Sequence, residues 1–242
     1  MNKKSYRTVF ISDVHLWNPK NQWDKLIKFL DSISFENLII IWDFIDYRQL
    51  KRFWKWWEKE QKSLDYINNL ANQWVKITYI QWNHDRKLKC WDGIEIQNMT
   101  ITRNIYYQTA NWKRYFVVHW DNMDWINKNW NFLWQIWSII TWVLRRIEHI
   151  RNKNVYKNSY ISIAERLEEW IKKIRMPESK INKLIKKYYK NIKCDWIILW
   201  HFHLAKHYKI SWIEYFNTWE RLKICSAVVE NKNWELELIF YE

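Results

Sequence analysis

Short blocks of β-branched and aromatic residues alternate with longer amphipathic blocks along the first third of this chain. Strand-like runs occupy Thr8–Ser12, Leu38–Ile41 and Val75–Ile80, and apolar positions at helical spacing fill Trp23–Ile33 and Arg48–Asn72. Short apolar runs bounded by polar residues are typical of buried strands, and a 3.6-residue repeat is typical of helices. This order of elements predicts an α/β fold that binds its ligands beyond the carboxyl ends of its strands.

The pattern changes after residue 98. Met99–Val118 predicts a β-hairpin, residues 125–190 are mainly helical and rich in lysine, and a strand returns at Asp195–Trp200 before further hairpins. The sequence has no internal repeat and no Gly/Ser-rich linker. We therefore predict a single domain, residues 1–242, with a helical insertion at about residues 125–190.

Tryptophan stands at many positions where glycine is expected. The chain contains 22 Trp and a single Gly, although glycine usually makes up about 7% of a protein. The suspect positions adjoin polar clusters at strand ends or lie between two strand-like runs, where hairpins favour glycine: Trp17, Trp42, Trp82, Trp120, Trp200, Trp112, Trp212 and Trp234. We hypothesise that most of these tryptophans stand for glycine, as happens when a UGA codon that its own cell reads as glycine is translated as tryptophan. The alternative is a genuinely tryptophan-rich protein.

Charge and cysteine content narrow the class of protein. The chain has 40 basic and 26 acidic residues, a formal net charge of +14, which favours nucleic acid, phosphorylated metabolites or an acidic membrane surface as partners. Three cysteines without a CxxC pair argue against a disulfide framework and a structural zinc site, and no signal-peptide pattern is evident, so we expect a cytoplasmic protein. The longest apolar stretch, Trp130–Leu144, is shorter than the roughly 20 residues of a membrane span. Peripheral contact with the inner face of an anionic membrane stays open as an alternative.

Five predicted strand ends carry side chains that bind metal ions. They are Asp13 with His15, Asp43, Asn83, His119, and His201 with His203. The two i, i+2 pairs place both side chains on one face of an extended segment. Carboxylate, imidazole and amide groups suit a pair of ions such as Mn²⁺, Zn²⁺ or Fe²⁺ and not a soft thiolate site. Any one of these residues is as well explained by helix capping or a buried core histidine, but their recurrence at five strand ends favours a metal centre.

Read with glycine at the tryptophan positions, five segments resemble the signature blocks of the calcineurin-like metallophosphoesterases in their order. The segments are DVHLW, WDFID, WNHD, HWDNMD and WHFHLA. The resemblance runs from about Thr8 to the C-terminus. The HWD block, the helical insertion and the ending YFNTWERLKICSAVVE are most similar to the UDP-2,3-diacylglucosamine diphosphatase branch, which makes a lipid A precursor. It implies a four-layer α/β/β/α sandwich with a dinuclear metal centre on its rim.

The resemblance also implies how the ligands divide between two divalent ions, for which we expect Mn²⁺, with Zn²⁺ or Fe²⁺ as alternatives. One ion would be held by Asp13, His15, Asp43 and His203, and the other by Asp43, Asn83, His119 and His201, with Asp43 bridging. Such ions lower the pKa of a water molecule and stabilise the negative charge on phosphoryl oxygens. A phosphoester or pyrophosphate bond is therefore the expected target.

Residues beside the implied ligands have expected supporting roles. His84 is placed to protonate the leaving oxygen or to hydrogen-bond a phosphate, and Asp85 is placed to fix its tautomer. Asp46 and Asp121 are expected to accept hydrogen bonds from ligand imidazoles. Basic residues of the insertion are candidates to contact a pyrophosphate or an anionic lipid, although a solvated basic face explains each equally well: Arg145, Arg146, Arg151, Lys153 and Lys157.

Three functions are compatible with these features. The first is hydrolysis of UDP-2,3-diacylglucosamine or a similar nucleotide-linked lipid precursor. The second is a calcineurin-like phosphodiesterase or nuclease with another substrate, since some members of the diacylglucosamine branch have Arg where this chain has His84. The third is a non-catalytic basic module that binds nucleic acid through its charge and aromatic rings.

Overall fold

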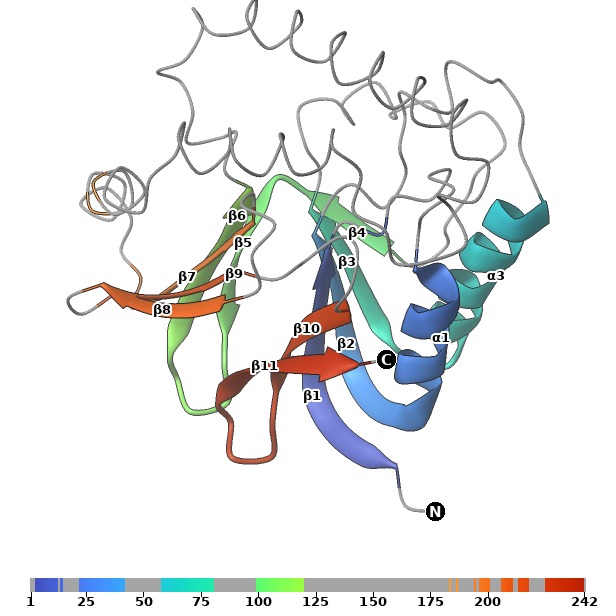
Figure 1. Cartoon of the computed structure of the whole chain (residues 1–242), viewed down its shortest axis with the longest axis horizontal. Coiled ribbons are helices and arrows are strands. Elements are labelled where there is room, and N and C mark those ends of the chain that lie inside the picture. The colour runs from blue at the N-terminus through green and yellow to red at the C-terminus, as the bar shows by residue number, and fades with distance from the viewer. Residues whose placement is uncertain are drawn as a thin grey trace, which may run out of the picture. The chain divides into compact units, whose positions relative to one another are not determined.

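The computed structural model describes the residues that build two β-sheets and the helices beside them. These are residues 3–12, 14, 22–41, 58–80, 99–119, 183, 186, 194, 196–200, 206–210, 213–217 and 225–241. The chain divides into two compact units, residues 1–121 with 194–242, and residues 122–193. Both sheets, shown in Figure 1, belong to the first unit.

The first sheet has six strands in the order β11-β10-β1-β2-β3-β4. Their bounds are β1 Lys4–Ser12, β2 Ile33–Ile41, β3 Lys76–Ile80, β4 Met99–Thr102, β10 Cys225–Glu230 and β11 Leu236–Tyr241. Strands β1 to β4 are parallel to their neighbours, whereas β10 is antiparallel to β1 and β11 to β10. Parallel strands are covered on both faces, which explains why β1 and β2 end in unbroken apolar runs.

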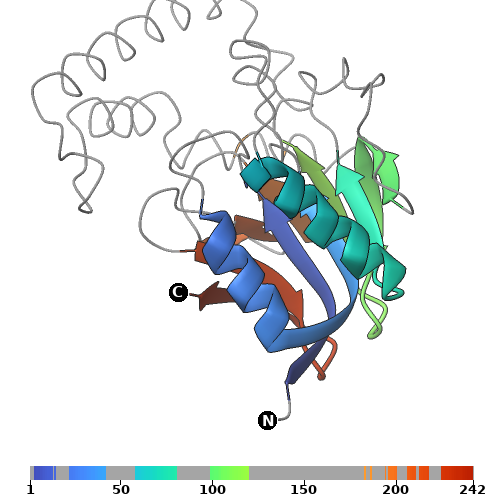
Figure 2. The same ribbon diagram turned by 90° about the vertical axis from the view of Figure 1, so that its right-hand side faces the viewer.

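Two helices of the described chain, α1 (Trp23–Ser32) and α3 (Glu58–Asn72), cover one face of the first sheet (Figure 2). Their buried apolar positions repeat at helical spacing: Leu26, Phe29 and Leu30 in α1, and Leu64, Ile67 and Ala71 in α3. The rings of Trp23 and Tyr66 meet edge to face with centroids 6.0 Å apart, and the Tyr66 hydroxyl donates to Asp31 at 2.8 Å. Apolar burial and a polar contact thus join the two helices.

The second sheet has five strands in the order β5-β6-β7-β9-β8. Their bounds are β5 Asn104–Gln108, β6 Arg114–His119, β7 Trp196–Trp200, β8 Lys206–Ile210 and β9 Ile213–Asn217. Strands β6, β7 and β9 are mutually parallel, and the antiparallel strands β5 and β8 form its edges. Segments from both sides of residues 122–193 therefore build one sheet.

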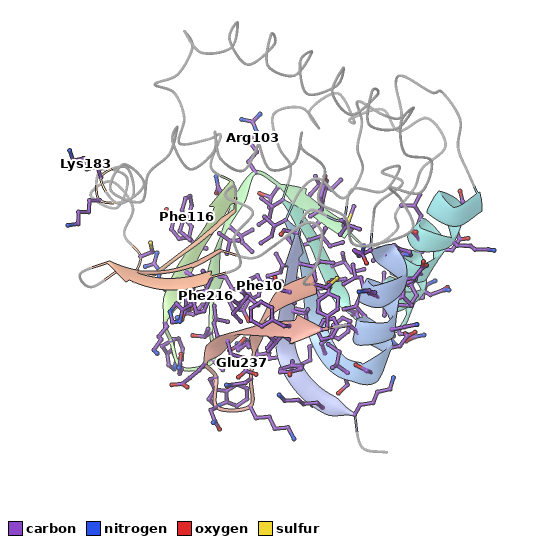
Figure 3. All side chains as sticks on the ribbon, viewed as in Figure 1. Phe10, Arg103, Phe116, Lys183, Phe216 and Glu237 are labelled. Atoms are coloured by element: carbon purple, nitrogen blue, oxygen red, sulfur yellow. The ribbon has the colours of Figure 1, made fainter. Side chains whose placement is uncertain are left out.

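The two sheets pack face to face around a second apolar core. It contains Phe10, Ile39, Ile41 and Ile80 from the first sheet and Tyr115, Val117 and Phe216 from the second. Phe10 also meets Tyr107 of β5 edge to face, with ring centroids 5.0 Å apart. Figure 3 labels Phe10 and Phe216 among the side chains between the sheets. The first sheet is thus buried by helices on one face and by the second sheet on the other.

The α/β class predicted from the sequence is confirmed, and the described residues supply three of the layers in the expected α/β/β/α order. The single hairpin predicted over Met99–Val118 is wrong. Its first part, β4, joins the first sheet beside β3, and only β5 and β6 pair as a hairpin in the second. The chain changes sheets at Arg103, labelled in Figure 3, and the alternation of side chains along the sequence does not record which sheet a strand joins.

Within the described residues, no helix combines the length and the apolar character of a membrane-spanning segment. The apolar stretch Trp130–Leu144 lies outside the described residues. So does the insertion expected at about residues 125–190, apart from Lys183 and Lys186. The single-domain organisation and the role of the insertion as a lid stay predictions.

Candidate metal centre at the strand ends

Strands β1, β2 and β3 end at one level of the first sheet. The register pairs Ser12 with Ile41 and Ile41 with Ile80, and these three residues are the last of their strands. The structure thus confirms the parallel arrangement that the sequence predicted. Since neighbouring strands lie about 4.8 Å apart, the three carboxyl ends span about 10 Å.

Candidate ligands follow these three ends closely in the sequence. Asp13 comes directly after Ser12, Asp43 is the second residue after Ile41, and Asn83 is the third after β3. The three ligands themselves lie outside the described residues. What the structure fixes is the level and the direction at which the chain leaves the sheet before each of them.

Two strands of the second sheet end in the same manner. β6 and β7 are parallel, and the register pairs His119 with Trp200, the last residue of each strand. The structure describes the backbone of His119 as the end of β6. His201 follows β7 directly, with His203 two residues later, and both lie outside the described residues.

The carboxyl ends of the two sheets lie at one end of the sandwich. Thr8 of β1 and Tyr107 of β5 are joined by a 2.6 Å hydrogen bond, and the amide of Ala110 donates to Glu230, which pairs with Thr8 in the sheet. The turn that precedes β6 therefore lies beside the middle of β1. From that level β1 runs to Ser12 and β6 to His119 in the same direction, as Figure 1 shows.

A buried carboxylate at the opposite end was not identified from the sequence. Glu230, the last residue of β10, has no exposed surface. It accepts hydrogen bonds from the Tyr107 hydroxyl, from the Ala110 amide at 2.9 Å and from Nη1 of Arg7 at 3.4 Å. A Glu that follows an apolar run and precedes Asn231 is typical of a surface turn, and neither partner is close in sequence, so no local signal predicts this cluster.

The hydrogen bonds around Tyr107 form a directed chain. Because the Tyr107 hydroxyl donates to Glu230, its oxygen accepts from Thr8, and Thr8 Oγ1 accepts in turn from Asn37 Nδ2 at 3.2 Å. Burial, and after it the hydrogen bond to Glu230, raises the pKa of Tyr107 well above its ordinary value. The phenol therefore stays protonated and serves as a neutral donor that joins the two sheets.

The described residues contain no group of three or more His, Cys, Asp or Glu that could hold a metal ion. Apart from His119, the predicted site residues all fall outside that part of the chain: Asp13, His15, Asp43, Asp46, Asn83, His84, Asp85, Asp121, Arg151, Lys157, His201 and His203. The donor set after the aligned strands is made of carboxylates, imidazoles and an amide, which fits a hard or borderline divalent ion. Burial raises the pKa of Cys225, which disfavours the thiolate that a soft ion would need.

No protein-family model matches this sequence, and no curated protein matches it. An archaeal phosphodiesterase of known structure is 14% identical, with 96% of this chain and 98% of that chain covered and a TM-score of 0.47. A predicted phosphoesterase from Streptococcus pneumoniae is 8% identical, with 97% of each chain covered and a TM-score of 0.37. A putative 5′-nucleotidase from Staphylococcus aureus is 12% identical, with 97% of this chain and 53% of that chain covered and a TM-score of 0.41. Similarity at this level does not assign an activity to this protein.

Proposed function

We propose that this protein is a metal-dependent phosphoesterase with a dinuclear centre beyond the aligned strand ends. The observation that carries the proposal is the common level and direction at which β1, β2 and β3 end, together with the parallel pair β6 and β7. Each of these strands ends at or just before a candidate ligand in the sequence. Helix capping explains one such residue but not five that leave the sandwich at one end.

Chain reach supports a common site. A residue advances the chain by at most about 3.6 Å, so Asp13, Asp43 and Asn83 are one to three residue lengths from ends that together span about 10 Å. His119 closes the facing strand β6, and His201 follows its parallel neighbour β7. Ligands from both sheets therefore start within reach of one ion pair.

In this proposal each ion takes a mixed set of oxygen and nitrogen ligands. Asp13, His15, Asp43 and His203 would hold one ion, and Asp43, Asn83, His119 and His201 would hold the other. When bound, such ions supply positive charge that activates water and stabilises the phosphoryl group under attack. Mn²⁺ is our first expectation, because the ligands are mixed and contain no thiolate.

The chain's own residues would then position the substrate and move protons. His84 would donate a proton to the leaving oxygen, and Asp85 would hold the other ring nitrogen so that the imidazole keeps the required tautomer. Asp46 and Asp121 would accept hydrogen bonds from ligand imidazoles and fix the orientation of their rings. Glycine in place of Trp42, Trp82, Trp120 and Trp200 would let the backbone turn tightly before each ligand and leave room for substrate.

For the substrate we propose a nucleotide-linked lipid pyrophosphate, with UDP-2,3-diacylglucosamine as the first compound to test. The sequence blocks quoted above and the formal charge of +14 support this choice, because a basic protein attracts a phosphorylated lipid and an anionic membrane surface. Arg151 and Lys157 are the proposed pyrophosphate contacts. The competing substrates are other phosphodiesters, including nucleic acid.

The activity is tested with bis(p-nitrophenyl) phosphate in the presence and absence of Mn²⁺. The chain with glycine at positions 42, 82, 120 and 200 is compared with the same chain carrying Asp43→Asn. We expect metal-dependent hydrolysis that falls by at least about a hundredfold in the variant, because a lost bridging ligand removes several kcal/mol of charge stabilisation. Asp65→Asn, a matched change on the exposed side of α3, is the control and should keep the full rate. Hydrolysis that ignores chelation, or that survives Asp43→Asn, would refute the proposal.

The substrate is tested separately. Release of UMP from UDP-2,3-diacylglucosamine at a higher kcat/KM than cleavage of bis(p-nitrophenyl) phosphate supports the lipid precursor. Metal-dependent cleavage of DNA or a cyclic nucleotide without UMP release would leave the phosphoesterase in place and reject the lipid substrate. RNA binding that persists after chelation, with no hydrolysis of any substrate, would favour the non-catalytic module.

A further inference from the structure

Three tryptophans adopt a backbone conformation that glycine favours. Among the described residues, Trp74, Trp112 and Trp234 are the only non-glycine residues with positive φ, at 69°, 69° and 64°. In this left-handed region a side chain with a Cβ atom crowds its own backbone, at a cost of roughly 1–2 kcal/mol per residue. A bulky residue with φ in this region is a genuine outlier, and all three outliers here are the same residue type.

Trp74 occupies the position after α3 where a helix usually ends in glycine. The amide of Val75 donates to the Leu70 carbonyl at 3.2 Å, and the amide of Trp74 donates to the Ala71 carbonyl at 3.2 Å. This pair of bonds is the Schellman motif, in which the residue in Trp74's place is left-handed and is most often glycine. The Trp74 side chain is 95% exposed, so packing does not repay the strain.

Trp112 and Trp234 occupy the same position in two separate hairpins. In the β5–β6 turn the Trp112 amide donates to the Thr109 carbonyl, and the Thr109 amide donates to the Lys113 carbonyl, both at 3.0 Å. The β10–β11 turn repeats this pattern, with Trp234 donating to Asn231 at 3.0 Å and Asn231 donating to Glu235 at 2.9 Å. A type I turn followed by one left-handed residue is the common three-residue hairpin, and it takes glycine at that last position.

Exposure again shows that these two indoles add little to the fold. Trp112 is 79% exposed and Trp234 is 45% exposed. Trp23 is the contrast, since it lies in the first turn of α1, is 2% exposed and packs against Tyr66. Glycine at position 23 would open a cavity in the core beneath the helices, whereas glycine at the other three positions would relieve strain.

We infer that the protein made by its own cells has glycine at positions 74, 112 and 234 and tryptophan at position 23. The chain's tryptophans then come from two codons, one that the cell reads as glycine and one that it reads as tryptophan. This inference rests on backbone conformation and burial and does not depend on the proposed phosphoesterase activity.

The direct test is peptide mass spectrometry of the protein isolated from the cells that produce it. Peptides covering positions 74, 112 and 234 should have the masses of glycine-containing peptides, and the peptide covering position 23 should contain tryptophan. The gene should carry UGA at the first three positions and UGG at position 23. Tryptophan found at any of the three turn positions, or glycine at position 23, would overturn the inference.

Stability measurements on recombinant protein provide a second, independent test. Trp112→Gly should raise the folding equilibrium constant by about fivefold, because relief of the left-handed strain exceeds the added chain entropy of glycine. Trp112→Ala removes the same indole but keeps Cβ, so it should produce no comparable gain. An equal gain from both variants would show that loss of the exposed indole, and not the backbone, is responsible, and would count against glycine. Trp23→Gly should lower the folding equilibrium constant.

Discussion

The two ends of the β-sandwich satisfy their polar groups in different ways. At one end, which we call the anchored end, the buried carboxylate of Glu230 binds Arg7, Tyr107 and the Ala110 amide, and tight turns close the two hairpins. At the other end, the catalytic end of our proposal, β1, β2, β3, β6 and β7 finish at common levels before segments rich in Asp, Asn and His. The anchored end joins the sheets internally, and the opposite end leaves donor groups for a ligand.

This difference shows how one fold separates stability from chemistry. A fully hydrogen-bonded buried network holds two sheets in a fixed relation, because breaking any member leaves another polar group unsatisfied. Loops carried by such a rigid scaffold can then hold charged and polar groups together for binding. Substitutions at the two ends should therefore affect different measured quantities.

The largest expected effect is on activity, at the catalytic end. Asp13→Asn should reduce metal-dependent phosphodiester hydrolysis by about a hundredfold or more, since a neutral amide is a weaker ligand than a carboxylate. In the absence of metal, the free energy of unfolding should change by less than about 0.5 kcal/mol, as for an ordinary surface substitution. Urea denaturation in EDTA, beside initial-rate assays with Mn²⁺, measures both quantities. A variant that unfolds more easily yet keeps its rate would reverse the roles of the two ends.

The next largest effect is on stability, at the anchored end. Glu230→Ala leaves the Ala110 amide and the Tyr107 hydroxyl without their acceptor and removes the partner of Arg7, which should lower the free energy of unfolding by about 2–4 kcal/mol. Urea denaturation checks this value. Glu237→Gln, which alters an ion pair with Lys4 on the surface, is the matched control and should cost less than about 1 kcal/mol. Equal losses in the two variants would show that burial of Glu230 has no special role.

Most of the first sheet could be predicted from the sequence, because its information is local. The runs before Ser12, Ile41 and Ile80 are apolar and β-branched, and the helix beginning at Trp23 repeats its apolar positions at helical spacing. These patterns fix element type and the parallel order expected of alternating strands and helices. The observed β1 and β2 are longer than predicted because their first residues are polar edges of paired strands, which carry no apolar signal.

The remaining features depend on partners far apart in the sequence. Nothing near Arg103 indicates that the chain leaves one sheet for the other, and nothing near Glu230 indicates that Arg7 and Tyr107 surround it. The candidate ligands were recognisable because each is tied to a strand end, which is again a local pattern. The left-handed turn at Trp74 was missed, since it ends a helix and has no strand on its amino side to mark a hairpin.

A smaller loss of stability is expected when one hydrogen bond of the anchored end is removed. Tyr107→Phe keeps the ring against Phe10 but deprives Glu230 and Thr8 of a partner, so it should lower the free energy of unfolding by about 1–2 kcal/mol. The neighbouring Tyr106, which is 53% exposed on the other face of β5, offers a matched control in Tyr106→Phe. That variant should unfold as the parent does. Equal losses in the two variants would mean that the hydrogen bonds of Tyr107 add nothing to the joint between the sheets.

The smallest expected effect is a dependence of this joint on alkaline pH. Burial raises the pKa of Tyr107, so above its ordinary pKa of about 10 the unfolded chain loses the phenolic proton while the folded chain retains it. Because the unfolded state then binds fewer protons, stability falls as pH rises, and the contribution of Tyr107 to that fall should be just under about 1 kcal/mol between pH 9 and pH 10.5. Urea denaturation of the parent and of Tyr107→Phe at both pH values measures the difference, and the variant should lose less stability over the interval. A steeper loss in the variant would mean that Tyr107 ionises more readily in the folded protein, which is incompatible with a phenol that donates to a buried carboxylate.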